Sequence, residues 1–245
     1  MAINFVPLNA NRHRHLKLIQ PQGYRYAREF GQSDLLLAEF GRASAHYPIV
    51  FASHTSGTVR PIALLSRDGE SNAFISSEGR WLSSYVPMVI RLHPFAIARV
   101  PEREAPVVCV DMNSELLSYD SGAPLFDING DRAPVLDQTL EQLNEVDQML
   151  RVTQDFCQLL QELGLLVPLT PQDQDFGMMP CVDDCYRVDD QAFDQLSDAG
   201  LRVLRQQGWL APLYAHRISL MRLGHLPVPE ITRDFRSQAL QKNQR

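Results

Sequence analysis

Hydrophobic positions within residues 134–163 repeat at intervals of three and four, which predicts one long helix. The apolar residues that keep this register are Leu136, Leu140, Leu143, Val146, Leu150, Cys157, Leu160 and Leu163. Pro134 suits the first turn of a helix, because the N–H that proline lacks would have no partner there. Gly164 suits the position just past the helix end. The pattern therefore predicts a helix of about 30 residues, long enough to cross a whole domain.

Shorter apolar runs before this helix have the length and the β-branched content of strands. The runs at 48–54 and 59–66 flank turn residues, so they predict a β-hairpin. Further strands are predicted at 24–30, 73–76, 95–100 and 106–112.

Two helices are predicted to cross this sheet region. The first begins after Ser33, a good N-cap, and ends before Pro48. The second comprises residues 81–92, whose apolar residues recur at helical spacing, and Pro94 ends it. Beyond the long helix, the chain predicts a short strand at 186–188, a helix from Asp189 to about Gly208, and a last helix at about 211–223.

The order of these elements predicts an α+β fold. We expect a mainly antiparallel sheet with two crossing helices in residues 1–132, and a helical part packed on that sheet in residues 133–226. The two regions form one compact unit in this interpretation, and residues 227–245 form a polar tail.

Composition narrows the class of protein. The net charge of −6 argues against sequence-independent binding to nucleic acid, which needs a basic surface. The N-terminus lacks the basic and apolar regions of a secretion signal, and no stretch reaches the roughly 18 apolar residues of a membrane span. We therefore expect a cytoplasmic protein that neither binds nucleic acid nor inserts into a membrane.

No motif for a cofactor, a metal or a catalytic nucleophile is found. Cys181 and Cys185 lie close together among the four cysteines, but no second ligand pair accompanies them. His13 and His15 could share a metal, although we interpret them as part of an exposed basic arm. Phosphate-binding, nucleophile-elbow and zinc-protease motifs are missing as well. The sequence predicts no metal and no cofactor, and leaves the catalytic residues unknown.

The richest group of potential ligand-binding side chains centres on residues 80–93. Arginine can bind a carboxylate with two hydrogen bonds, and tryptophan and tyrosine offer rigid contact area. The candidate ligand-binding residues are His46, Tyr47, Arg80, Trp81, Tyr85, Arg91 and His93. The alternative interpretation is structural, with the aromatic side chains on a buried helical face. His216 is interpreted as a buried histidine with its hydrogen bonds satisfied.

Two functions stay open on these residues. The first is a non-enzymatic accessory protein that binds a peptide or a small anionic ligand in a groove. The second is an enzyme acting on a peptide or small metabolite, with His46 or His93 as acid and base and Arg80 or Arg91 holding the substrate. A protein partner and a homo-oligomer are compatible with both.

Short motifs in chain order carry a resemblance to a known family. They are residues 4–9 (NFVPLN), 39–40 (EF), 46–51 (HYPIVF), 79–82 (GRWL), 85–87 (YVP), 93–95 (HPF), 116–118 (LLS), 122–126 (GAPLF) and 214–220 (YAHRISL). Over residues 4–226 the chain resembles the SapC family of bacterial proteins, which is distinct from the peptide-transport permease of the same name. The resemblance implies an accessory role in uptake or modification systems.

Overall fold

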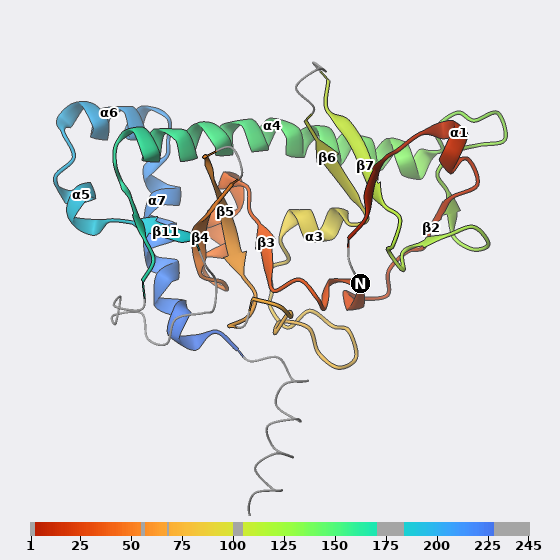
Figure 1. Ribbon diagram of the computed structural model, residues 1–245, viewed down its shortest axis with the longest axis horizontal. Coiled ribbons are helices and arrows are strands. Elements are labelled where there is room, and N and C mark those ends of the chain that lie inside the picture. Colours follow the sequence, from red (N-terminus) through yellow and green to blue (C-terminus); the bar gives the residue numbers. More distant parts are fainter. Residues whose placement is uncertain (1–2, 55–56, 68, 100–104, 171–183, 228–245) are drawn as a thin grey trace, which may run out of the picture.

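The computed structural model describes residues 3–54, 57–67, 69–99, 105–170 and 184–227. Antiparallel sheets and helices segregate along the chain, which confirms the predicted α+β class (Figure 1). Within these ranges, no helix is long and apolar enough to cross a membrane.

The largest sheet has five antiparallel strands in the order β10-β11-β4-β5-β3. Their bounds are Leu166–Pro168 (β10), Cys185–Val188 (β11), Ile49–Ser53 (β4), Val59–Leu64 (β5) and Gln32–Asp34 (β3). The predicted hairpin is confirmed as β4 and β5, which pair from Ile49 with Ala63 to Ser53 with Val59. Strands β10 and β11 follow the long helix in sequence, so the C-terminal region completes this sheet.

Two three-stranded sheets lie on the other side of the molecule (Figure 1). The first has the order β1-β7-β6, with bounds Phe5–Pro7, Val107–Asp111 and Phe95–Ala98. The second has the order β8-β2-β9, with bounds Leu117–Ser118, Lys17–Leu18 and Ala123–Pro124. A short helix, α1 (Ala10–His13), leads from β1 to β2 and buries His13, contrary to its interpretation as part of an exposed arm.

The predicted long helix is confirmed as α4, Pro134–Glu162, which runs across the five-stranded sheet and the β1-β7-β6 sheet (Figure 1). Its C-terminal half buries Phe156 and Leu160 in the core of the five-stranded sheet. Its N-terminal half buries Leu143 and Val146 in the core of the β1-β7-β6 sheet. One helix thus contributes buried side chains to both hydrophobic cores.

The C-terminal helices pack beside the five-stranded sheet. They are α5 (Asp190–Asp194), α6 (Asp198–Gln206), α7 (Leu210–Ser219) and the 3₁₀ helix η4 (Leu220–His225). The single helix predicted after Asp189 is divided into α5 and α6, because Ser197 starts a new helix by accepting a hydrogen bond from the N–H of Gly200 at 3.2 Å.

The helix predicted at 81–92 is wrong over its first half. Only α3, Met88–Leu92, is helical, and Pro87 is its N-cap residue. The preceding segment takes its hydrogen bonds from distant residues instead: the N–H of Leu82 donates to the carbonyl of Phe74 at 2.7 Å. Tertiary contacts therefore override helical spacing here.

Two predicted strands are also wrong. Residues 24–30 contain the 3₁₀ helix η1, Arg25–Ala27. Within 73–76, pairing is reduced to one bridge between Ile75 and Trp81.

The helix predicted after Ser33 begins later. Ser33 itself lies in β3, and η2 (Leu37–Glu39) and α2 (Phe40–Ala43) follow it. The Glu39 carboxylate accepts the N–H of Leu36 at 2.8 Å, so the helical turn starts there rather than at Ser33.

Candidate functional site

Three of the aromatic candidates form one hydrogen-bonded group. Tyr47 is fully buried, and its hydroxyl donates to the carbonyl of Tyr85. The indole N–H of Trp81 reaches the Tyr47 hydroxyl and the Tyr85 carbonyl, each at 2.9 Å. Burial raises the pKa of Tyr47, so its hydroxyl stays protonated at neutral pH. This group holds the irregular segment before α3 against the core.

A buried carboxylate completes the group, and it belongs to the motif at residues 39–40 but not to the candidate ligand-binding residues. Glu39 is only 3% exposed and accepts three hydrogen bonds. The Tyr85 hydroxyl donates to Oε1 at 2.6 Å, as does the N–H of Met88 at 2.8 Å, while Leu36 donates to Oε2. A buried charge needs such partners, and here they come from two segments, Leu36 just before η2 and residues 85–88 before and at the start of α3. The spacing of residues along the sequence does not reveal that Glu39 lies beside Tyr85 in the fold.

The remaining candidates near this group lie at the surface. Arg80 is exposed and pairs with Glu78 at 3.1 Å, and Arg91 is exposed on α3. His46 is half-buried, and its Nε2 lies 2.9 Å from the Ser84 hydroxyl. Burial lowers the pKa of His46, so the imidazole is mainly neutral at pH 7. None of these three side chains, nor Trp81, lines the cleft described below.

His93 is the candidate residue that borders a large cleft. Its ring stacks on Tyr26 with a centroid distance of 5.1 Å, and its Nε2 lies 2.9 Å from the Ser114 hydroxyl. The carboxylate of Asp111 lies 3.8 Å from the same nitrogen. In a catalytic triad the carboxylate orients the ring through the opposite nitrogen, so these three residues do not have that geometry. Burial lowers the pKa of His93, and Asp111 partly offsets the effect.

The cleft lies between the five-stranded sheet and the β1-β7-β6 sheet and has a volume of about 790 Å³. Strands β3 and β6 border it, while α3 and α4 supply apolar walls. The apolar lining consists of Ile3, Phe5, Phe30, Val89, Ile90, Leu92, Phe95, Ala96, Ile97, Leu143, Val146 and Leu150. Small-molecule sites typically measure roughly 300–1,000 Å³ and are mainly apolar with a few polar groups, so this cleft has the size and character of a binding site.

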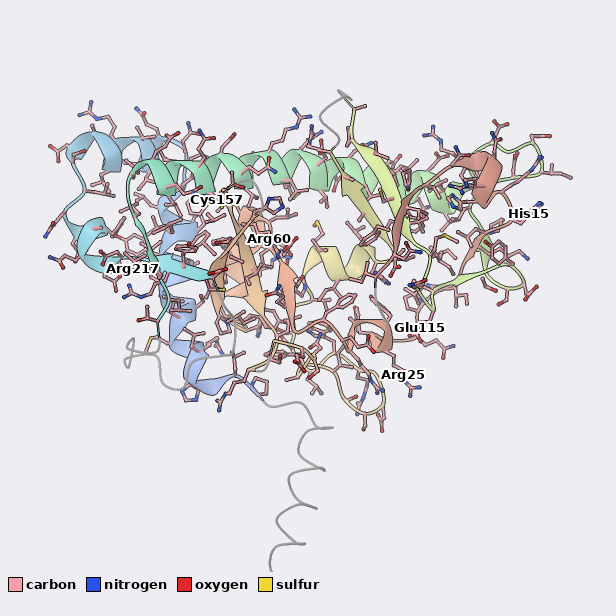
Figure 2. The ribbon with its side chains drawn as sticks, viewed as in Figure 1. His15, Arg25, Arg60, Glu115, Cys157 and Arg217 are labelled. Carbon is pink, nitrogen blue, oxygen red and sulfur yellow. The ribbon has the colours of Figure 1, made fainter. Side chains whose placement is uncertain are left out.

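Charged and polar side chains line the part of the cleft formed by the five-stranded sheet. Arg60 on β5, labelled in Figure 2, forms an ion pair with Asp34 on β3, from diagonal positions of neighbouring strands. Glu29, His54 and His93 line the cleft as well. The side chains of Arg60 and Asp34 are 35% and 48% exposed, so a ligand can reach both.

Sequence reasoning found one residue of this cleft, His93, and missed the others. Arg60 stands alone in a predicted strand and Asp34 at the start of a predicted helix, and no motif marks either residue. The otherwise continuous apolar sequence of β5 could have shown that Arg60 is the one polar residue of a largely buried strand. Within the described ranges, no group of three or more His, Cys, Asp or Glu residues is placed to hold a metal ion. Cys181, considered above as a ligand, lies outside these ranges.

The fold and the cleft define an α+β protein with a hollow between two antiparallel sheets. The SapC family model matches residues 8–226, which is most of the chain. The chain belongs to the SapC family. No curated protein and no solved structure matches it.

Proposed function

We propose that this SapC-family protein is a non-enzymatic accessory protein that binds a ligand in the cleft between its two sheets. The observation that carries the proposal is the composition of the cleft. Apolar side chains of α3 and α4 face it together with the Asp34–Arg60 ion pair, so the cleft suits a ligand with an apolar body and polar, hydrogen-bonding groups.

The proposal places the protein in the cytoplasm. Cys109 and Cys157 are buried thiols that form no disulfide, which is typical of a reducing compartment. Burial raises the pKa of Cys157 to about 12, so this thiol is inert at neutral pH.

An enzyme is the second candidate, because His93 lines the cleft, is held by Ser114, and is mainly neutral at pH 7. A neutral imidazole beside a bound substrate can act as a general base. Under this alternative, His93→Gln abolishes turnover with little change in thermal stability. If the variant mainly loses stability, the histidine is structural.

The binding proposal is tested by filling the cleft. Val89 on α3 lines it and is 37% exposed, whereas Val152 on α4 is 47% exposed and lies outside it. Val89→Trp therefore reduces the space for a ligand, and Val152→Trp is the matched control. The wild type and both variants are expressed in and purified from the organism that makes the protein, and their masses are measured by native and denaturing mass spectrometry.

We expect the wild type and Val152→Trp to carry the same extra mass, and Val89→Trp to carry at least tenfold less. Equal thermal unfolding temperatures of the two variants show that both keep the fold. The proposal is contradicted if all three proteins show only the mass of the polypeptide under native conditions. It is also contradicted if all three retain the same extra mass.

A further inference from the structure

The strands β3 and β6 line the cleft with their outer edges, where main-chain groups face away from the rest of each sheet. In a strand, successive side chains point to opposite faces, so a strand that presents one face contributes every second residue. β3 and β6 each contribute three consecutive residues, 32–34 and 95–97. Each is also the outermost strand of its sheet. The cleft is therefore lined by two main-chain edges.

The hydrogen bonds of β3 show which of its main-chain groups face the cleft. The N–H of Leu65 donates to the carbonyl of Gly31 at 2.9 Å, so the odd-numbered residues of this segment bond to β5. In an antiparallel pair, the residues between them direct both N–H and C=O to the other side. Gln32 and Asp34 therefore present their main-chain groups away from β5, where the Asp34 carbonyl also accepts the Ser33 hydroxyl at 3.1 Å.

The same reasoning applies to β6. The N–H of Asp111 donates to the carbonyl of Pro94 at 2.8 Å, so the even-numbered residues bond to β7. Phe95 and Ile97 direct their N–H and C=O groups away from β7. Both edges thus offer donors and acceptors spaced two residues apart, which is the pattern that an extended chain matches.

We propose that the ligand of the cleft is an extended peptide segment that inserts between β3 and β6 and pairs with both edges. This inference rests on the proposed function, because it takes the cleft to be the binding site. Main-chain hydrogen bonds give affinity in such strand addition, and pockets for alternate side chains give specificity. Leu143, Val146 and Leu150 of α4 line the cleft, so the peptide has an apolar residue at every second position.

The test uses a pool of N-acetylated, C-amidated eight-residue peptides in which apolar residues alternate with serine or threonine. The best-retained peptide is then made in two forms, each N-methylated at alternate residues. Alternate N–H groups of an extended chain point to the same side, so each form loses the donors of one edge. A peptide that pairs with one strand only can still present its unmodified edge, whereas one that pairs with both cannot.

We expect both methylated forms to bind at least tenfold more weakly than the parent peptide. If either form binds as tightly as the parent, insertion between two edges is refuted. If no peptide of the pool binds, the peptide inference fails. In that case an extra mass lost only from Val89→Trp still supports the proposed binding function, so the two failures are distinguishable.

Amide hydrogen exchange supplies an internal control. The N–H groups of Gln32, Asp34, Phe95 and Ile97 should exchange at least tenfold more slowly with peptide bound. Ala96 changes less, because its N–H already bonds to β7. Uniform slowing of all these amides, or none, contradicts pairing at the edges.

Discussion

His216 lies between two strands that separate towards one end of the five-stranded sheet. Continued along β4 and β11, the register of their pairing places Ile49 opposite Val188. The imidazole takes the place of a direct hydrogen bond between them: Nε2 accepts the N–H of Val188 at 3.1 Å, and Nδ1 donates to the carbonyl of Ile49 at 2.8 Å. The side chain is fully buried, which confirms its interpretation as a satisfied core histidine.

Replacing His216 with alanine leaves the Ile49 carbonyl and the Val188 N–H buried and unpaired. Each unsatisfied group costs roughly 1–3 kcal/mol, and the cavity left by the ring adds to this. We expect His216→Ala to lower the free energy of unfolding by about 3–5 kcal/mol. His216→Gln keeps a donor and an acceptor, so we expect a loss of about 1–2 kcal/mol.

The pH dependence of stability has a defined sign. Burial lowers the pKa of His216 to about 3, whereas an unfolded chain has a histidine pKa of about 6.5. The neutral ring therefore contributes fully above about pH 6.5, and the contribution is lost as the pH falls towards about 3. At about 1.4 kcal/mol per pH unit, the loss between about pH 6.5 and 4.5 is roughly 2–3 kcal/mol.

Urea unfolding, followed by tryptophan fluorescence at several pH values, measures both effects. His225→Ala is the control, because this histidine is exposed on η4, and we expect a change within about 0.5 kcal/mol. Burial also lowers the pKa of His93, so the decisive quantity is the difference in pH slope between wild type and His216→Gln. The reasoning is refuted if the two slopes agree, or if His216→Ala is as stable as the control.

Three further changes test the supports of the fold by urea unfolding. Glu39→Gln replaces one of the two carboxylate oxygens by an NH₂ group, which then faces a hydrogen-bond donor instead of accepting from it. We expect the free energy of unfolding to fall by about 2–3 kcal/mol, and wild-type stability would contradict this. Thr153→Val leaves the buried N–H of Leu37 without its 2.9 Å acceptor and should cost about 1–2 kcal/mol, more than a surface substitution. Gly164→Ala forces alanine into a φ of +65° and should lower the free energy of unfolding by about 1 kcal/mol. Gly41→Ala, inside α2, should be neutral or stabilising. Equal effects of the two substitutions would show that the positive φ of Gly164 is not the cause.

Elements with strong local signals could be predicted from sequence. The long helix is marked by its period, by Pro134 at its start and by Gly164 after its end, and the structure keeps all three features. The β4–β5 hairpin is marked by two apolar runs around turn residues. In these segments the local preference and the tertiary environment agree.

Segments whose hydrogen bonds come from distant residues could not be predicted in this way. The spacing of Trp81 and Tyr85 favours a helix, but the Tyr85 carbonyl is occupied by the side chains of Trp81 and Tyr47. The cleft is harder still, because it depends on the outer edges of β3 and β6. Those edges are fixed by pairing with β5 and β7, and spacing in the sequence does not reveal which edge stays uncovered.

The central claim is that the cleft between the two sheets is the ligand-binding site. A crystal structure of the protein purified from its own cells, with its retained ligand, tests this claim most directly. We predict electron density for the ligand between β3 and β6, in contact with Val89 and the Asp34–Arg60 pair. Ligand density at another place on the molecule, with the cleft filled only by water, would contradict it.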